Sequence, residues 1–358
     1  RCPQDDRHDQ TKEKGGDGKL PQRRLLRHVG LEFVGHKSSD RGDGLTANRL
    51  AAYSASGFLF WPKQRASPLY HCVMPGFKPS ISLFNRKTVA VVLASLFLVA
   101  CPFFLMLFET SFIYYPSRQI LGSPSDEGLI FEDIHRTTSD GLRIHGWLMK
   151  PTSEPVAWLL FSHGNAGNIS GRPRIAQPLV ARRVAVLLYD YRGYGKSEGN
   201  PDEQGTYLDG QAMLEELLSR ARQPRQVFLF GRSLGGGVSH ELAVRHPELG
   251  GLITDATFTS IPQLARILFP IPGVWRVMRT RYDNLSKVPQ IKIPRLVMHG
   301  TQDEMIPFSM AEQLRDATNP PAQFFPISGA GHNDTFLRGG SEYADAIVRF
   351  IEQCQSSP

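Results

Sequence analysis

A series of short, continuous apolar runs, separated by stretches with helical character, most constrains the fold of this chain. Buried parallel strands have unbroken apolar runs because both of their faces are covered. Strands that alternate with helices indicate a mostly parallel sheet with helices on both faces, and so an α/β protein. The predicted strands are 131–137, 142–149, 156–162, 184–189, 226–230, 251–254, 295–298 and 323–327, the first two as a hairpin. Helices are predicted over 172–183, 202–222, 236–245 and 342–353.

The pattern G-x-S-x-G occurs once between a predicted strand and a predicted helix, as Gly231-Arg232-Ser233-Leu234-Gly235. In that context the pattern forms a tight turn that exposes a nucleophilic serine. The turn also brings the N–H of Leu234 to a helix N-terminus, where negative charge is stabilised. The sequence therefore predicts Ser233 as a nucleophile and Leu234 as an oxyanion-hole donor. A chance Gly-Ser-Gly turn is the alternative.

A serine hydroxyl needs a base that accepts its proton, and a carboxylate that orients this base. After a nucleophile elbow the acid comes next along the chain and the histidine last. Asp303 and His332 appear in that order, each on a loop that follows a predicted strand, where open sheets place their sites. Asp255 also follows a strand and is the competing acid. Three neighbours are expected to be structural: Asp334, His299 and His240.

A second glycine-rich loop, residues 163–168, follows the strand 156–162 at the same edge of the sheet. We predict that the backbone N–H of Asn165 is the second oxyanion donor, and a plain connecting turn is the alternative. The loop lacks the spacing of a phosphate-binding P-loop, and no Cys/His cluster suggests zinc. No metal and no organic cofactor is therefore expected.

Five motifs occur in order along the chain: HGNAGN (163–168), DYRGYGKSEG (190–199), GRSLGG (231–236), HGTQDEMIP (299–307) and GAGHND (329–334). Together they resemble the membrane-anchored α/β hydrolases described as abhydrolase-domain or lysophospholipase-like proteins. The resemblance covers about residues 88–352 and implies the α/β-hydrolase fold. It also implies a small lid over the pocket at about 259–288. That segment is strongly apolar from Ile267 to Trp275, and a helix that covers the sheet edge is an equal alternative.

An uncharged apolar stretch of 21 residues, 88–108, precedes the predicted sheet. This length crosses a hydrocarbon core of about 30 Å as a helix. Arg86 and Lys87 lie directly before it, so the positive-inside rule places the N-terminus in the cytoplasm and the catalytic domain on the other side. We expect a single transmembrane signal-anchor over 86–109, a linker over 110–128 and a catalytic domain over 129–356. Lipoprotein processing at Cys101 and a buried core helix are the alternatives.

Residues 1–80 are expected to be a disordered leader, of which residues 1–73 are untranslated if translation begins at Met74. The formal net charge of the chain is +7, but the excess lies in this leader. The first 87 residues contain 16 Lys and Arg against 8 Asp and Glu, and the remainder 25 against 26. A nearly neutral catalytic domain argues against a nucleic-acid partner. The sequence predicts no oligomeric state.

The function predicted from these residues is cleavage of carboxylic esters, lipid acyl esters among them, through Ser233, Asp303 and His332. The substrate partner is then a small molecule or a lipid acyl group. A thioesterase or a serine peptidase would use the same triad. A membrane scaffold that has lost its activity is the non-enzymatic alternative.

Overall fold

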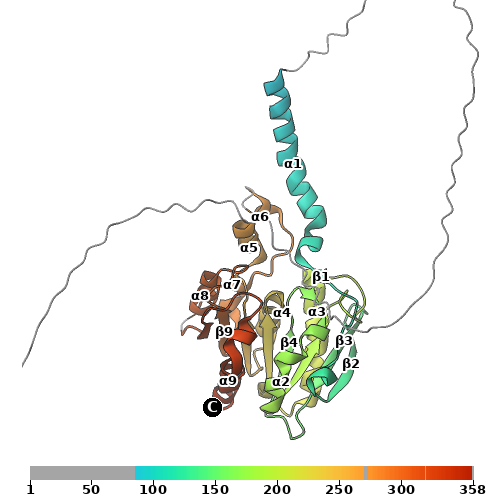
Figure 1. Ribbon diagram of the computed structural model, residues 1–358, viewed down its shortest axis with the longest axis vertical. Coiled ribbons are helices and arrows are strands. Elements are labelled where there is room, and N and C mark those ends of the chain that lie inside the picture. Colours follow the sequence, from blue (N-terminus) through green and yellow to red (C-terminus); the bar gives the residue numbers. More distant parts are fainter. Residues whose placement is uncertain (1–84, 270–272, 319, 357–358) are drawn as a thin grey trace, which may run out of the picture. The chain divides into compact units, whose positions relative to one another are not determined.

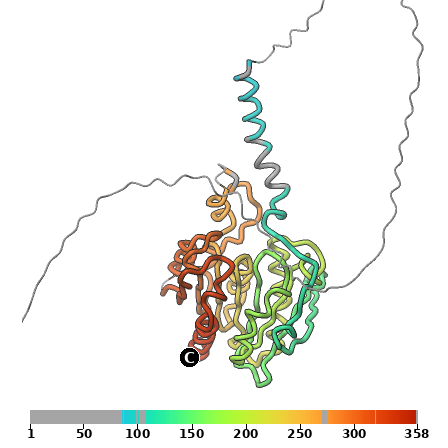
Figure 2. The backbone as a smooth tube through the Cα atoms, in the orientation of Figure 1, coloured from blue at the N-terminus to red at the C-terminus, as the bar shows by residue number. Residues whose placement is uncertain are grey.

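The computed structural model describes residues 85–269, 273–318 and 320–356 (Figures 1 and 2). The predicted leader, residues 1–80, lies outside the described residues. Within the described part, the predicted parallel sheet and its flanking helices are present, and the predicted α/β fold class is confirmed.

The main sheet has eight strands in the order β10-β9-β8-β7-β4-β6-β3-β2. Only β3 runs antiparallel to its two neighbours, and the other neighbouring pairs are parallel. The predicted hairpin and the six further predicted strands all correspond to observed strands. Their bounds are β2 (Phe131–Thr137), β3 (Arg143–Met149), β4 (Ala157–Ser162), β6 (Val184–Tyr189), β7 (Val227–Arg232), β8 (Gly251–Asp255), β9 (Arg295–Gly300) and β10 (Gln323–Ile327).

Two hydrophobic clusters, one on each face of this sheet, explain why its strands are apolar throughout. Along β4, Trp158 and Leu160 pack into the cluster under α3 and α4, whereas Leu159 and Phe161 pack into the cluster under α2 and α9. Successive side chains of a strand point to opposite faces, so both sets must be apolar. The helices are α1 (Arg86–Ile113), α2 (Pro173–Ala181), α3 (Glu203–Arg220), α4 (Leu234–Arg245), α5 (Ile261–Leu268), α6 (Val274–Val277), α7 (Asn284–Lys287), α8 (Phe308–Asp316) and α9 (Thr335–Ser356).

Short elements complete the described chain. A two-stranded parallel sheet joins β1 (Tyr115–Pro116) to β5 (Ala166–Gly167). The last helix, α9, begins earlier than the sequence predicts: a helical stretch from Thr335 precedes a kink at Gly340, whose φ is 53°, and the predicted helix follows that kink. The 3₁₀ helices are Pro124–Glu127, Ile169–Gly171, Pro224–Gln226 and Val288–Gln290.

Helix α1 covers the segment that the sequence predicts to be a transmembrane anchor, residues 86–109. A span needs about 20 consecutive, mainly apolar residues. No helix in the described part of the chain meets the length and hydropathy that crossing a membrane requires. The predicted transmembrane helix is therefore not supported by the structure. The C-terminal end of α1 lies beside α6, although the two are far apart in the sequence (Figure 1).

Candidate active site

Ser233, His332 and Asp303, which the sequence singles out on three separate loops, are brought together in one hydrogen-bonded chain. Ser233 lies between β7 and α4, Asp303 follows β9, and His332 follows β10. The Oγ atom of Ser233 is 3.0 Å from Nε2 of His332. The Nδ1 atom of His332 is 2.8 Å from Oδ2 of Asp303. This is the geometry in which an imidazole accepts a serine proton while a carboxylate holds the imidazole in place.

The turn that carries Ser233 is strained, and its neighbours explain why the motif contains glycines. Ser233 has a φ of 52°, which is uncommon for a residue other than glycine. A Cβ atom at Gly231 would lie 2.5 Å from the carbonyl oxygen of Gly235, so no larger residue fits there. The turn thus places Ser233 at the end of β7, where it lines the pocket, and is fixed by close backbone packing.

Asp303 lies in an environment that keeps its carboxylate charged. Burial raises the pKa of Asp303, but hydrogen bonds from His299 and His332 outweigh burial and hold this pKa well below its usual value. The Oδ1 atom of Asp303 also accepts the backbone N–H groups of Met305 and Ile306, at 2.9 and 2.7 Å. An ionised Asp303 can stabilise the imidazolium that forms when His332 accepts a proton.

Asp255, the competing acid, is engaged elsewhere. Its Oδ2 atom accepts hydrogen bonds from Thr335 Oγ1 at 2.8 Å and from Tyr343 OH at 2.9 Å. The same oxygen is 3.3 Å from Nε of Arg232. The structure therefore places Asp303, and not Asp255, against the ring of His332. Sequence reasoning missed Arg232, which carries no motif signal of its own beyond its place next to Ser233.

The other titratable neighbours are bound in ways that fit a structural role. Burial lowers the pKa of His240 to about 3, and its Nδ1 lies 2.7 Å from the carbonyl oxygen of Gly236. Asp334 Oδ1 accepts the backbone N–H of Gly331 at 2.7 Å, within the loop that precedes His332.

The two predicted oxyanion donors, Leu234 and Asn165, both line the pocket beside Ser233. Leu234 is the first residue of α4, so its N–H is one of those that a helix leaves without an intrahelical acceptor. The Asn165 carbonyl accepts from Tyr115 N at 3.0 Å and from Tyr194 OH at 2.7 Å. Its side-chain amide donates to the carbonyl of Ile113 at 3.0 Å. The end of α1 and the strand β1 thus hold the Asn165 loop, which the sequence-based division into a linker and a catalytic domain did not reveal.

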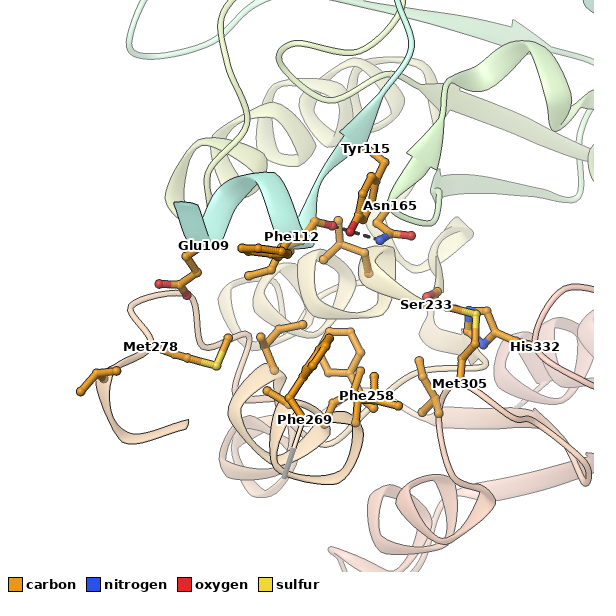
Figure 3. A pocket seen from close by; sticks show the side chains of 18 residues that line it. Glu109, Phe112, Tyr115, Asn165, Ser233, Phe258, Phe269, Met278, Met305 and His332 are labelled. Atoms are coloured by element: carbon orange, nitrogen blue, oxygen red, sulfur yellow. Dashed lines mark hydrogen bonds between the residues drawn. The ribbon is translucent and has the colours of Figure 1, made fainter. Parts of the chain in front are cut away.

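A cavity of about 330 Å³ extends from Ser233 and His332 (Figure 3). Its walls are almost entirely apolar, and Glu109 is the one carboxylate among the described lining residues. In Figure 3, Glu109 and Met278 lie at the end of the pocket opposite Ser233. The remaining wall residues come from α1, β1, the segment after β8, α5, α6 and the Asp303 loop, and they include Phe112, Tyr115, Phe258, Ile261, Leu264, Leu268, Val277 and Met305. Among the described residues, no group of His, Cys, Asp and Glu has the arrangement of a metal site.

The sequence of this chain is similar to those of known proteins. Residues 153–276 match the family described as "Serine aminopeptidase, S33". The α/β hydrolase domain-containing protein WAV2 of Arabidopsis thaliana is 34% identical over 276 residues, which cover 70% of this chain and 89% of the relative. The chain belongs to the α/β-hydrolase superfamily. An uncharacterized protein of Mycobacterium tuberculosis is also 34% identical, over 67% of this chain and 86% of its own length.

Solved structures show the same fold for this hydrolase. An esterase from Pyrococcus furiosus superposes with a TM-score of 0.56 at 17% identity, over 67% of this chain and 98% of the esterase. A puromycin-hydrolyzing peptidase of Mycobacterium tuberculosis gives a TM-score of 0.52 at 17% identity, over 64% of this chain and 40% of the peptidase. Because both enzymes have this fold, the superfamily fixes the architecture of the hydrolase and leaves its substrate to the pocket.

Proposed function

We propose that this hydrolase cleaves carboxylic esters that carry an apolar acyl group, through a Ser233–His332–Asp303 triad. The observation that supports this proposal is the hydrogen-bonded chain from Ser233 to Asp303 at one end of an apolar cavity. Ligand pockets of comparable size are typically apolar with a few convergent polar groups. An acyl chain in this cavity would bring its carbonyl carbon to Ser233 Oγ.

Each residue has a defined task in this mechanism. Ser233 Oγ attacks the ester carbonyl while His332 Nε2 accepts its proton, and the ionised Asp303 stabilises the imidazolium. The protonated His332 then donates that proton to the departing alkoxide, which leaves an acyl group on Ser233 Oγ. In the second half, water attacks the acyl-enzyme, His332 again accepts the proton, and Ser233 is regenerated with release of the acid.

The oxyanion that forms in both halves needs donors on the side of the carbonyl oxygen. We assign this role to the backbone N–H groups of Leu234 and Asn165. The position of Leu234 at the start of α4 adds the positive end of a helix dipole. Loss of one such donor typically costs about 10² to 10³ in rate.

A serine aminopeptidase is the second candidate, because the matched family has that description. Such an enzyme must bind a free ammonium group, and a carboxylate in the pocket is the natural partner. Both carboxylate oxygens of Glu109 already accept backbone N–H groups, from Arg279 and Thr280. None of the other described residues that line the pocket is anionic, and the pocket therefore favours a substrate with an uncharged acyl group. A thioester would be attacked by the same residues and differs only in its leaving group.

We also propose that α1 attaches the hydrolase to a membrane, with the catalytic domain on the non-cytoplasmic side. The side chains of Val91, Leu93, Leu96 and Phe97 are at least 60% exposed in this helix, and exposed apolar stretches of this size favour lipid contact. Alkaline carbonate extraction of cells that express the chain, with protease protection of a C-terminal tag, tests this proposal. Recovery of the protein in the soluble fraction before extraction would contradict it.

The function itself is tested by labelling purified protein with a fluorophosphonate probe, in wild type and in Ser233→Ala. Labelling of wild type alone, with hydrolysis of p-nitrophenyl esters, is expected. The substrate panel also includes an acyl thioester and amino-acid p-nitroanilides. Faster turnover of the anilides than of the esters would favour the aminopeptidase. A folded wild type that neither binds the probe nor turns over any substrate would favour the scaffold.

A further inference from the structure

Residues 279–282, here called the exit segment, lead the chain from the pocket-lining helices back towards the sheet. Glu109, in the last turns of α1, binds the first half of this segment. Its Oε2 accepts the backbone N–H of Arg279 at 3.0 Å, and its Oε1 accepts that of Thr280 at 2.7 Å. Glu109 is only 6% exposed, so these bonds form in a largely water-free environment, where bonds to an ionised acceptor are strong.

A second carboxylate binds the other half of the exit segment. Glu203, in the first turn of α3, accepts the backbone N–H groups of Arg281 at 2.6 Å and Tyr282 at 2.8 Å. Four consecutive backbone N–H groups are thus held by two glutamates from two different helices. Tyr282 has a φ of 36°, and a non-glycine residue keeps such a conformation only when its surroundings fix it.

The hydrogen bonds of Glu109 have a consequence for the pocket. Glu109 and Phe112 lie one helical turn apart on α1, and both line the cavity. Val277 and Met278, which immediately precede the exit segment, also line the cavity, and Met278 lies at the same end as Glu109 (Figure 3). Because Glu109 ties α1 to the exit segment, it sets the spacing between these two walls. At the end of the pocket near Ser233, the Asn165 loop is held by its own hydrogen bonds to Ile113, Tyr115 and Tyr194, and not by the bonds of Glu109 to the exit segment.

We propose that Glu109 is a specificity-determining residue that fixes the end of the pocket distant from Ser233, and so selects esters with long acyl chains. The proposal rests on the proposed ester hydrolysis. A short acyl group contacts only the walls near Ser233 and is insensitive to Glu109. A chain long enough to reach Phe112 and Met278 gains its packing energy between walls that Glu109 holds together.

The kinetic test compares p-nitrophenyl acetate with p-nitrophenyl decanoate for wild type, Glu109→Gln and Glu198→Gln. A glutamine amide would place its NH₂ group against one of the two N–H donors, so the exit segment loses part of its anchor. For Glu109→Gln we expect kcat/KM for decanoate to fall about tenfold, chiefly through KM, because a hydrogen bond to a charged group is lost. Hydrolysis of acetate should stay within about twofold of wild type.

Glu198→Gln is the matched control. The exposed carboxylate of Glu198 also accepts a backbone N–H, that of Arg143 at 3.0 Å, but Glu198 does not line the pocket. Both esters should be hydrolysed by this variant as by wild type. If Glu109→Gln does not fold, Glu109→Asp keeps the charge but withdraws the carboxylate by one methylene, and the same chain-length dependence is expected.

Hydrogen–deuterium exchange tests the anchor without reference to activity. Amides of a peptide that covers 276–283 should exchange about tenfold faster in Glu109→Gln than in wild type, with other peptides unchanged. Unchanged exchange of Arg279 and Thr280, or an equal loss of activity towards both esters, overturns the role of Glu109 and leaves ester hydrolysis intact. A wild type that hydrolyses no ester and does not bind the probe overturns the proposed function, and the specificity role with it.

Discussion

The Nη2 atom of Arg232 donates to the main-chain carbonyl of His332 at 2.6 Å, so the residue next to the proposed nucleophile holds the backbone of the proposed base. Arg232 is only 5% exposed, and its Nε lies 3.3 Å from Asp255. Asp255 is bonded in turn to Thr335 and Tyr343 of α9, the helix that follows His332. The buried ion pair between Arg232 and Asp255 therefore links the ends of β7 and β8, and Arg232 connects this pair to the His332 loop.

We expect Arg232→Lys to lower kcat without a matching change in KM. Lysine keeps the positive charge beside Asp255 but lacks the second donor that reaches the His332 carbonyl. Displacement of His332 by a fraction of an ångström should cost about tenfold in kcat. The rate of fluorophosphonate labelling of Ser233 should fall in parallel, whereas a purely structural role would change the melting temperature alone.

Removal of the charge at the same position should be much more damaging to stability. Arg232→Met leaves Asp255 buried without its cation, and broken buried pairs typically cost about 3–5 kcal/mol. The double variant Arg232→Met/Asp255→Asn removes both charges and should recover most of that loss in a urea denaturation experiment. Its kcat should stay low, because the bond to the His332 carbonyl is still missing. Full recovery of activity in the double variant would contradict the positioning role.

Asp303→Asn tests the assignment of the acid. Asparagine has nearly the same shape but no charge, and its amide can favour the wrong tautomer of His332. We expect kcat to fall on the order of 10⁴-fold with the fold retained. The check is steady-state ester hydrolysis together with a circular dichroism spectrum. Wild-type turnover in Asp303→Asn would reopen the assignment in favour of Asp255.

The sheet of this hydrolase was predictable because its strands are covered on both faces. Such strands give continuous apolar runs that two hydrophobic clusters then bury, and all eight predicted strands are present. The kinked start of α9 was not predictable in the same way. Gly340 lies in an otherwise helical pattern, and the periodicity of the neighbouring residues gives no sign of its positive φ.

The three candidate catalytic side chains could be singled out because each has a local signature at a strand end. The residues that support them have none. Glu109 lies at the end of a strongly apolar segment, and its neighbours give no indication of its role. Glu203 has the position of an ordinary acidic residue in the first turn of a helix. Both are recognisable only once the chain has folded back on the exit segment, because their partners are backbone N–H groups 170 and 78 positions away in the sequence.

Asn165→Ala should lower kcat although it keeps the proposed backbone donor. The side-chain amide of Asn165 donates to the carbonyl of Ile113, and loss of this bond frees the loop from the end of α1. A misplaced oxyanion donor should cost about tenfold to a hundredfold in kcat, with a smaller change in KM. Stopped-flow measurement of acyl-enzyme formation checks this expectation. An unchanged acylation rate would show that the loop is held well enough by Tyr115 and Tyr194.

The stability of the hydrolase should depend on pH through His240. The unfolded imidazole binds a proton below about pH 6.5, whereas the buried His240 has a pKa of about 3 because of desolvation. Between these values the unfolded state binds more protons, so the free energy of unfolding rises with pH by up to about 1.4 kcal/mol per unit. Urea titrations at pH 7 and pH 5.5 give the free energy of unfolding at each pH. Its decrease from pH 7 to pH 5.5 should be about 1 kcal/mol smaller in His240→Gln than in wild type. An equal decrease in the two proteins would show that the pKa of His240 is the same in the folded and the unfolded state.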